Sequence, residues 1–464
     1  MAKPATSKPS STKTPPPISL ELRKKYFNIC NPEKPLDPTD AEYVDVDDLQ
    51  PKARGLSAVG DLAEPIELSD EPVTALFTGL PGSGKSTELR RLAVRLADPE
   101  SANLLPVIID AEEVLDLYTT IDVPDVLLAI VYKTEVTLLE AEGKKAKDAL
   151  KESIAKRLFH WLTETEVGIQ GIDFTAGAEA GLPGAAKVSA GAKVVTTMKT
   201  SPSLRKEVRD KLAGKMTAFV SRVAEATREL NERAKKRKRS GLVVIFDSLE
   251  KLRGGSTTWE DVLKSAEDVF RGGAPNLRLP VHTVYTMPAA LTYRMSIDVT
   301  FLPMLKLLDR DGNHCEEGFA AAREIIRKRV PDQHLQQFLG ASSTDARVRR
   351  ILAWSGGYPR EIVRLLQLCV QQPSLDDERF EQLLALAGDK ICRMVPESAY
   401  AWLANVHLTK DPAAKKPEER VMIDDLLQNN VVLRYHNKRP WFDLHPAVRA
   451  IPAIKALIES ARTK

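Results

Sequence analysis

Short apolar runs alternate with longer segments of helical periodicity over the first 300 or so residues. Each run is followed at once by a glycine or a polar residue; the runs are Val73–Thr78, Leu104–Ile109, Leu242–Phe246 and Val281–Tyr285. Apolar residues recur at helical spacing in Asp125–Leu139 and Ala146–Leu162. Buried strands separated by helices are typical of a parallel sheet covered on both faces. The pattern predicts an α/β fold for this part of the chain.

Beyond Thr286 the pattern becomes helical. The predicted helices are Glu316–Lys328, Asp345–Trp354, Arg360–Val370 and Asp376–Ala387. A further helix near Glu418–Leu427 precedes two strand-like runs, Val431–Tyr435 and Pro440–Leu444, joined by a polar turn. Helices followed by a two-stranded hairpin describe a winged-helix unit.

Two segments depart from this alternation. Residues 1–19 are rich in Pro, Ser, Thr and Lys, a composition that predicts a disordered tail. Phe174–Val195 has small apolar residues at every second position around Pro183-Gly184, which is typical of a β-hairpin. Its many Gly and Ala residues fit a flexible excursion equally well, and contact with a partner or another subunit is a further interpretation.

These patterns divide the chain into four parts. We predict a tail at 1–19, an α/β core at 20–300 with an insertion at 167–200, a helical lid at 301–375 and a winged-helix-like domain at 376–464. At about 150 residues per domain, 464 residues give two or three folded units.

Composition narrows the cellular setting. Lys plus Arg less Asp plus Glu is 67 − 64 = +3, so the overall charge does not point to nucleic acid or a membrane. The four cysteines are scattered without metal-ligand spacing, which argues against structural zinc and disulfides and for a reducing cytosol. No apolar run approaches the roughly 20 residues of a membrane span, and the N-terminus lacks a signal-peptide core. We expect a soluble cytoplasmic protein with no membrane partner.

The strongest motif is a G-x-x-x-x-G-K-S sequence between a predicted strand and a predicted helix. It consists of Gly79, Leu80, Pro81, Gly82, Ser83, Gly84, Lys85 and Ser86, and Thr87 follows it into the helix. Glycines let consecutive backbone N–H groups turn toward one anion, and the helix N-terminus adds a partial positive charge. Lys85 is expected to reach the β- and γ-phosphates and Ser86 to ligate Mg²⁺. The motif predicts a nucleotide site.

A carboxylate at the end of a neighbouring strand would complete such a site. Asp247 follows the strand Leu242–Phe246 and is the predicted second Mg²⁺ ligand. Glu250 lies three residues further on, where it either polarises the attacking water or acts as a helix N-terminal carboxylate. Because Glu250 is not adjacent to Asp247, we expect slow hydrolysis.

These motifs resemble those of P-loop ATPases of the AAA+/STAND type, the signal-transduction switch ATPases related to NB-ARC and NACHT proteins and to origin-recognition initiators. The run Asp247–Glu250 is similar to the D-G/S-L-D-E pattern of that group. Thr286 sits where the family places its sensor-1 residue. Trp354–Arg360 looks like the GxP motif of the lid, whose proline, here Pro359, packs against the nucleotide, and Arg360 falls at the sensor-2 position.

Two weaker matches extend the resemblance. Arg54-Gly55 is similar to an element that lines the adenine pocket, and Phe442–Arg449 resembles a winged-helix motif whose histidine, here His445, touches the ADP β-phosphate. Structural alternatives stay open: a helix stop and restart at Gly357 and Pro359, a packed strand-end residue at His445 and a solvated Arg360. Any arginine finger acting in trans would come from Arg271, Arg278 or Arg294.

The basic run Lys235–Arg239 has two interpretations. Five consecutive cations favour an acidic partner or a phosphate backbone, and a solvated helix C-terminus explains them as well. Tyr435, Lys438, Arg439 and Trp441 on the predicted wing are further candidates for nucleic-acid contact.

Three functional hypotheses follow. The first is a molecular switch that binds ATP and Mg²⁺ and changes conformation or homo-oligomeric assembly with nucleotide state. The resemblance implies prokaryotic signalling or antiphage defence, with a protein sensor or effector as partner. The second is an initiator-like ATPase whose winged helix binds duplex DNA. The third is a nucleotide-dependent scaffold with little turnover.

Overall fold

The computed structural model describes residues 17–143, 153–162, 199–253, 258–413 and 419–463. The predicted tail up to residue 16 and the predicted hairpin at Phe174–Val195 lie outside the described residues. Of the helix predicted over Ala146–Leu162, the described part contains α7 (Ile154–His160).

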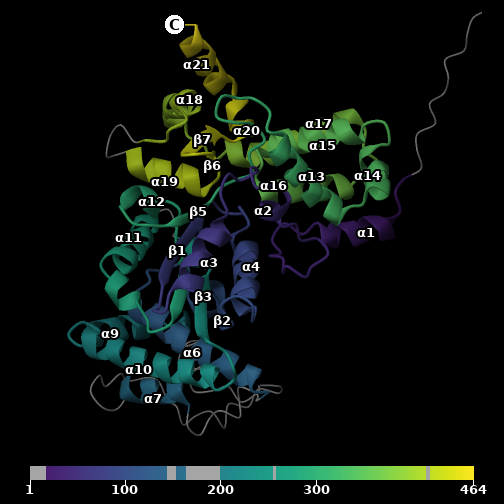
Figure 1. Ribbon diagram of the computed structural model, residues 1–464. Coiled ribbons are helices and arrows are strands. Elements are labelled where there is room, and N and C mark those ends of the chain that lie inside the picture. Colours follow the sequence, from purple (N-terminus) through teal and green to yellow (C-terminus); the bar gives the residue numbers. More distant parts are fainter. Residues whose placement is uncertain (1–16, 144–152, 163–198, 254–257, 414–418, 464) are drawn as a thin grey trace, which may run out of the picture.

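A five-stranded parallel sheet lies at the centre of the α/β core (Figure 1). Its strands are β1 (Thr74–Gly79), β2 (Leu104–Asp110), β3 (Gly241–Asp247), β4 (His282–Thr286) and β5 (Thr300–Leu302), in the order β2-β3-β4-β1-β5. The four predicted strands are confirmed, each end shifted by one residue at most. The edge strand β5 was not predicted, because three residues carry too little pattern to show a strand.

Alternate residues of the central strands pack against helices on opposite faces of the sheet. From β3, Val243 and Ile245 pack with α3 (Ala58–Leu68) and α4 (Lys85–Ala97). Val244 and Phe246 lie in the cluster on the other face, to which α7 and four further helices contribute. The four further helices are α6 (Val123–Ala141), α9 (Pro202–Leu212), α10 (Met216–Lys235) and α11 (Trp259–Arg271).

Helix α3 shows tertiary packing overriding local sequence signals. It contains Gly60 and Pro65, which usually weaken or end a helix, and it was not predicted. Its start is capped by the Ser57 hydroxyl, which accepts a hydrogen bond from the Gly60 N–H. Burial of Val59, Leu62, Ala63 and Ile66 against the sheet stabilises it.

Five helices follow the sheet and form a second apolar cluster. They are α13 (Glu316–Arg329), α14 (Asp332–Leu339), α15 (Thr344–Ser355), α16 (Pro359–Val370) and α17 (Asp377–Cys392). The N-terminal helix α1 (Leu20–Ile29) packs on this helical region, where the Tyr26 ring lies 5.7 Å from that of Phe338. Figure 1 shows α1 beside α14 and α16, away from the sheet.

The C-terminal part consists of helices around a two-stranded antiparallel hairpin. The helices are α18 (Tyr400–Thr409), α19 (Arg420–Gln428), α20 (Pro446–Arg449) and α21 (Pro452–Arg462). The hairpin pairs β6 (Val432–His436) with β7 (Pro440–Leu444). The expected order of α/β core, helical region and C-terminal hairpin is confirmed, and the exact domain boundaries stay predictions.

Short helices complete the described chain: α2 (Val46–Leu49), α5 (Ala111–Val114), α12 (Leu291–Arg294) and the 3-10 turns η4 (Leu249–Lys251), η5 (Ala274–Leu277) and η6 (Glu397–Ala399). No helix among the described residues has the length and apolar character needed to cross a membrane.

Candidate nucleotide-binding site

The predicted phosphate loop joins β1 to α4, as the motif requires. Gly82 and Gly84 have left-handed backbone, with φ of 77° and 104°, which residues with a Cβ rarely adopt. A Cβ on Gly79 would lie 2.9 Å from the Leu302 carbonyl oxygen. The N-terminus of α4 has no side-chain cap, so its backbone N–H groups are directed at the loop. The loop is shaped to surround an anion.

Lys85 is buried at the base of this loop. Its ammonium donates hydrogen bonds to the carbonyl oxygens of Gly79 at 2.9 Å and Leu80 at 3.2 Å. It also lies 3.1 Å from a carboxylate oxygen of Glu250. The structure thus brings together the two charged residues that the sequence assigned to phosphate binding and to water activation.

Asp247 ends β3 beside the loop and is almost fully buried. Burial, and then the neighbouring carboxylate of Glu250, raise the pKa of Asp247, while a hydrogen bond from the Ser86 side chain opposes the rise. The two predicted Mg²⁺ ligands, Ser86 and Asp247, are therefore in contact.

The backbone between Asp247 and Glu250 is strained. Ser248 has φ of 69°, a left-handed conformation that costs a non-glycine residue roughly 1–3 kcal/mol. Its N–H donates to the Asp247 carboxylate at 2.7 Å. Because η4 follows immediately, the chain turns Glu250 back toward Lys85.

Thr286 supports this turn from the end of β4. Its hydroxyl accepts a hydrogen bond from the Leu249 N–H at 2.9 Å and donates to the Phe246 carbonyl at 3.2 Å. The side chain is fully buried and does not line the cavity above the loop. Thr286 thus contacts the Glu250 segment directly.

A cavity of about 1330 Å³ lies over the phosphate loop. That volume is ample for a nucleotide, since ligand pockets usually measure about 300–1,000 Å³. Its lining includes the loop from Pro81 to Thr87, the N-terminal strap (residues 31–36), the start of α16 and one face of α19. Core, helical region and C-terminal part therefore all border one cavity.

The predicted lid motif lies at this cavity. Gly356 and Gly357 end α15 with φ of 62° and 78°, and Pro359 begins α16. A Cβ on Gly357 would lie 1.9 Å from the Leu305 carbonyl oxygen, so only glycine fits. The helix stop and restart is therefore present, and Pro359 also lines the cavity.

Arg360 lines the same cavity and contacts two other segments. Its backbone N–H donates to the Gly82 carbonyl at 3.3 Å. Its guanidinium lies 3.4 Å from the Glu33 carboxylate of the strap. The strap is itself tied to the loop, because the Leu36 N–H donates to the Thr87 hydroxyl at 3.1 Å.

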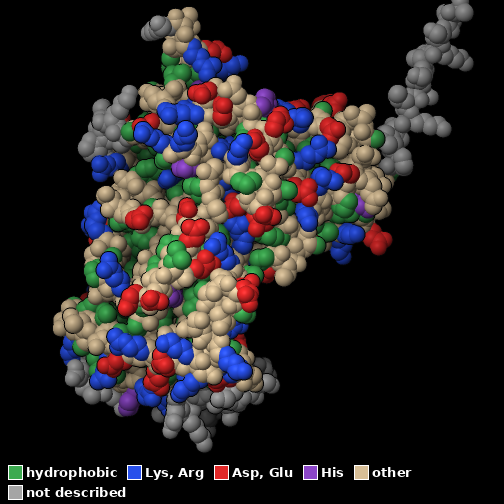
Figure 2. Space-filling model, viewed as in Figure 1, with side chains coloured by type: hydrophobic (Ala, Val, Ile, Leu, Met, Phe, Trp, Pro, Cys, Tyr) green, Lys and Arg blue, Asp and Glu red, His purple; other side chains and the backbone are tan. Residues whose placement is uncertain are grey.

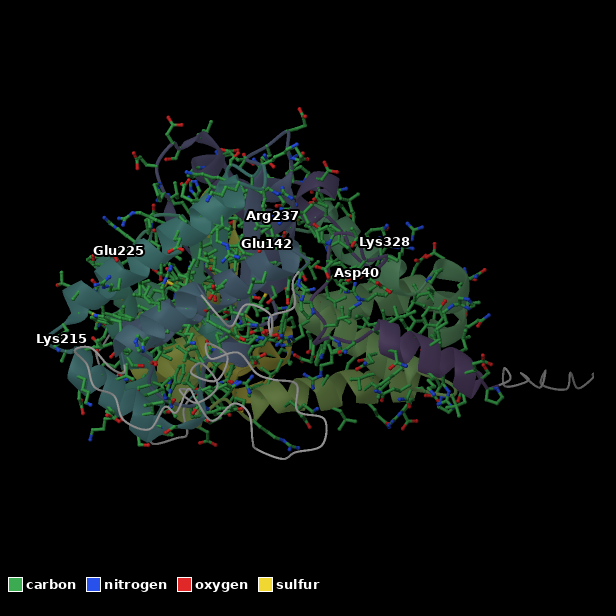
Figure 3. The ribbon with its side chains drawn as sticks, turned by 90° about the horizontal axis from the view of Figure 1, so that it is seen from below. Asp40, Glu142, Lys215, Glu225, Arg237 and Lys328 are labelled. Carbon is green, nitrogen blue, oxygen red and sulfur yellow. The ribbon has the colours of Figure 1, made fainter. Side chains whose placement is uncertain are left out.

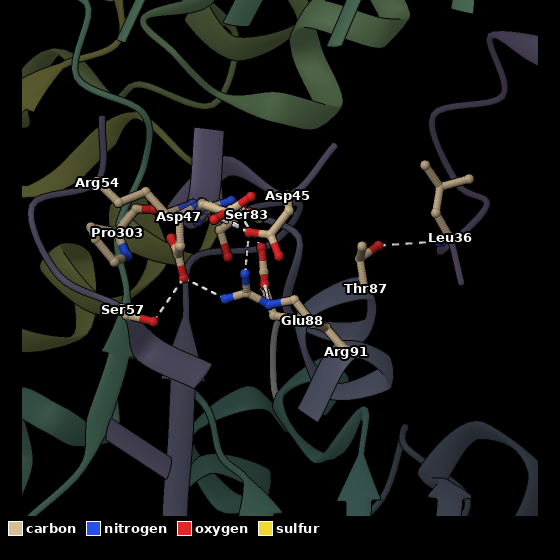
Figure 4. Close-up of polar contacts among 11 residues, drawn as sticks. Leu36, Asp45, Asp47, Arg54, Ser57, Ser83, Thr87, Glu88, Arg91 and Pro303 are labelled. Atoms are coloured by element: carbon tan, nitrogen blue, oxygen red, sulfur yellow. Dashed lines mark hydrogen bonds and ion pairs between the residues drawn. The ribbon is translucent and has the colours of Figure 1, made fainter. Parts of the chain in front are cut away.

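A buried charge network behind the loop was not predicted. Arg54 donates to the Ser83 and Pro303 carbonyls, the latter at 2.9 Å, and lies 3.5 Å from Glu88 (Figure 4). Glu88 also pairs with Arg91 at 3.1 Å, and burial raises the pKa of its carboxyl despite both guanidinium groups.

Arg91 carries this network to the N-terminal segment. It forms ion pairs with Asp45 and Asp47, and Asp47 accepts a hydrogen bond from the Ser57 hydroxyl at 3.0 Å. The sequence showed Glu88 and Arg91 only as polar helix positions, and apart from their mutual pair their partners Arg54, Asp45 and Asp47 lie more than 30 residues away. In the structure Arg54 thus lies against the phosphate loop and lines the cavity.

His445 lies outside the cavity lining. It is fully buried, and its Nδ1 accepts a hydrogen bond from the Ala447 N–H at the start of α20. The cavity face of the C-terminal part is formed by α19 instead, through residues such as Met422, Asp425 and Gln428.

The three candidate finger arginines differ in their surroundings. Arg294 is clamped between Glu260 at 2.8 Å and Asp424 at 2.7 Å, which joins α12 to α19. Arg271 pairs with Glu267 and donates to the Arg294 carbonyl. Arg278 is exposed on the turn before β4.

The basic run Lys235–Arg239 binds the ends of other helices. Helix α10 ends at Lys235, and Arg237 beyond it donates to the Ala141 carbonyl at the end of α6; Figure 3 shows Arg237 beside Glu142. Arg239 donates to the Ala97 carbonyl, at the end of α4, at 2.8 Å. Cations at helix C-termini are stabilising. On the face in Figure 2, basic and acidic side chains are interspersed.

The predicted wing packs on the core. The Met304 N–H donates to the Arg434 carbonyl at 2.9 Å, and the Lys306 ammonium donates to the Asn437 side chain at 2.9 Å. A Cβ on Gly55 would lie 2.5 Å from the His436 carbonyl oxygen. The hairpin tip is therefore docked beside the Arg54-Gly55 element.

Comparison with known proteins adds little. No protein-family model matches the chain, and no curated protein matches it. A crystal structure of Cdc6p from Pyrobaculum aerophilum is similar over 94% of this chain and 98% of that chain, with 10% identity and a TM-score of 0.33. A similarity of this size establishes neither family nor function. The strand order and the phosphate loop by themselves define an α/β protein with a P-loop-like parallel sheet.

Proposed function

We propose that this protein is an ATP-binding, slowly hydrolysing molecular switch of the AAA+/STAND type, whose conformation or assembly changes with nucleotide state. The observation that carries the proposal is the contact between Lys85 and Glu250 beneath a cavity bordered by core, helical region and C-terminal part. A ligand in that cavity touches all three parts at once.

The donor set fits a triphosphate with a divalent cation. The left-handed glycines and the uncapped start of α4 offer backbone N–H groups, and Lys85 supplies a cation. Ser86 and Asp247, already in contact, would hold Mg²⁺. One carboxylate oxygen of Glu250 is buried without a hydrogen-bond partner among the described residues, so it is available to a water molecule.

We assign reading of the nucleotide state to Arg360, which lines the cavity, and to Thr286, which lies outside the cavity and would act through the Glu250 segment. Arg360 pairs with Glu33 of the strap at 3.4 Å, so a γ-phosphate that binds Arg360 would compete with the strap for its guanidinium. Thr286 holds the Glu250 segment through Leu249. Only the γ-phosphate distinguishes the ATP-bound state from the ADP-bound state. The difference in binding free energy that its contacts provide limits how far ATP can shift the conformational equilibrium.

Calorimetric titration with ATP and ADP tests the proposal. Lys85→Ala should abolish binding, since it removes the main counter-charge of several phosphates. Lys235→Ala is the matched control, because it removes the same charge from an exposed pair with Glu232. Retention of affinity within a few-fold of wild type in Lys85→Ala would overturn the assignment. Light scattering with ATP, ADP and no nucleotide then measures the change in assembly.

A further inference from the structure

Three segments that are distant in the sequence meet at the tip of the phosphate loop. The side-chain amide of Asn430 donates to the Pro81 carbonyl at 3.2 Å and to the Tyr358 hydroxyl at 3.3 Å. Tyr358 packs against the next loop residue so closely that a Cβ on Gly82 would lie 2.5 Å from its ring. The loop tip is therefore held by the turn after α19 and by the residue before α16.

Asn430 has a backbone conformation that favours a specific side chain. It lies between α19 and β6 with φ of 55°, a left-handed conformation in which glycine is unstrained and asparagine is the best-tolerated alternative. The residue is 7% exposed. A glycine would satisfy the turn, so the asparagine adds the one thing glycine lacks, an amide that reaches Pro81.

Docking of the C-terminal part does not depend on this amide. Asp424 of α19 pairs with Arg294 at 2.7 Å, and the Gln428 amide donates to the Glu250 carbonyl at 3.4 Å. The hairpin tip is held separately through Asn437 and Lys306. Loss of the Asn430 amide should therefore free the loop tip while the surrounding parts stay in place.

We infer that Asn430 is a positioning residue for the phosphate loop: its amide fixes the Pro81 carbonyl and the Tyr358 hydroxyl, so that the loop holds its anion-binding shape only while the turn after α19 is docked. The carbonyl of Pro81 is thereby directed at Asn430. The inference rests on the proposed function for its nucleotide readout, whereas its structural readout is independent of it.

It follows that nucleotide binding and docking of the C-terminal part are coupled in both directions. If the docked turn stabilises the loop, a nucleotide that fixes the loop must stabilise the docked turn by the same free energy. Losing one buried amide with its hydrogen bonds changes free energy by about 1–2 kcal/mol, a factor of roughly 5–30 in affinity.

The experiment compares Asn430→Gly, which keeps the left-handed turn, with Tyr358→Phe, which removes only the hydroxyl. Asn103→Gly is the matched control, since it makes the same change at another left-handed asparagine, with φ of 51°, whose amide donates to the Lys238 carbonyl before the start of β2, away from the loop. Hydrogen exchange of residues 79–84 is measured without nucleotide, and ATP affinity and the nucleotide dissociation rate are measured for each variant.

We expect faster exchange of the loop in Asn430→Gly, ATP binding weakened roughly 5- to 30-fold through faster dissociation, a smaller effect in Tyr358→Phe and none in Asn103→Gly. Loop exchange equal to that of wild type in both loop-facing variants would overturn the inference, even if ATP binds normally. Wild type that binds no ATP would overturn the proposed function, and the exchange result would still decide the role of Asn430. Should Asn430→Gly fail to fold, Tyr358→Phe decides it.

Discussion

The ammonium nitrogen of Lys85 lies 3.1 Å from the carboxylate of Glu250, and both side chains are buried. A phosphate group entering the loop competes with Glu250 for this ammonium. The pair therefore keeps the lysine charge compensated and holds the carboxylate at the place where hydrolysis would need it. Glu250 competes with phosphate for Lys85 in binding and is the candidate base in hydrolysis. Substitution of either residue therefore affects ATP binding and ATP turnover differently.

Glu250→Gln should retain or strengthen ATP binding, because the amide no longer competes as an anion for Lys85. If Glu250 is the general base, hydrolysis should slow by roughly 10²-fold or more. Calorimetry and a phosphate-release assay on one preparation measure both effects. Glu267→Gln, which alters a half-buried carboxylate paired with Arg271 outside the site, is the matched control. An unchanged turnover number would show that Glu250 only holds Lys85, as a scaffold with little turnover would require.

Asp247→Asn should remove most of the Mg²⁺ dependence of ATP binding. Burial raises the pKa of Asp247, so wild-type Mg²⁺-dependent affinity should fall on acidification from a higher pH than an ordinary aspartate would give. The variant should bind ATP weakly with no such pH dependence. Titrations at several pH values with and without Mg²⁺ measure this difference.

Asp247→Asn should weaken ATP binding but raise the stability of the fold. The pKa of Asp247 is higher in the folded protein than in the unfolded chain, so the ionised carboxylate destabilises the fold. This loss of stability sets in as the pH rises from the unfolded-state pKa to the folded-state pKa. Asn keeps the oxygen that accepts from the Ser248 N–H. At neutral pH the variant should therefore melt a few degrees higher than wild type. A lower melting temperature would show that the ionised group is stabilised by contacts we have not assigned.

Much of the fold followed from local sequence signals, whereas part of the site did not. The four long strands are apolar runs, and the phosphate loop is a continuous motif, so both could be predicted from neighbouring residues. Strand β5, at three residues, and α3, with its internal Gly and Pro, exist because of what they pack against. The N-terminal strap and Asn430 reach the loop from far along the chain, and Asn430 lies 349 residues from Pro81. Nothing in the local pattern around Asn430 indicates such a partner.

His445→Asn tests whether the histidine is structural. Burial lowers the pKa of His445 to about 3, below the unfolded value of about 6.5, so protonation favours unfolding as the pH falls through that interval. Protonation of this residue in the unfolded chain should make the free energy of unfolding fall by up to about 1.4 kcal/mol per pH unit between about pH 6.5 and 5. Asp125, Asp247 and Asp424 have pKa values raised to about 6 and titrate in the same range, so the His445 contribution is measured as the difference in slope between wild type and the variant. Asn still caps α20 and should abolish that contribution. ATP and ADP affinity should stay unchanged, and a loss of ADP affinity would instead support nucleotide contact by His445.

The basic run separates the switch from a DNA-bound initiator. Arg239 caps the end of α4, whereas Lys236 in the same run is exposed. If the run is structural, Arg239→Ala should lower the free energy of unfolding by about 1–3 kcal/mol, since it leaves the Ala97 carbonyl without its charged donor, and Lys236→Ala should have no effect.

Binding of duplex DNA to Arg239→Ala and Lys236→Ala tests the alternative, that the basic run contacts DNA. Should the run contact DNA phosphates, each substitution removes one charge, so each would reduce the slope of log affinity against log salt by about one unit, whatever its effect on stability. Neutralising Lys438 and Arg439 would reduce it further. Because the hairpin tip is docked on the core through Asn437, and α19 presents Asp425 rather than cations to the cavity, we expect weak DNA binding whose salt slope none of these substitutions changes. Filter binding at several salt concentrations measures the slope. Tight, ATP-enhanced binding that loses about one unit of slope in Lys236→Ala as well as in Arg239→Ala would favour the initiator over the switch.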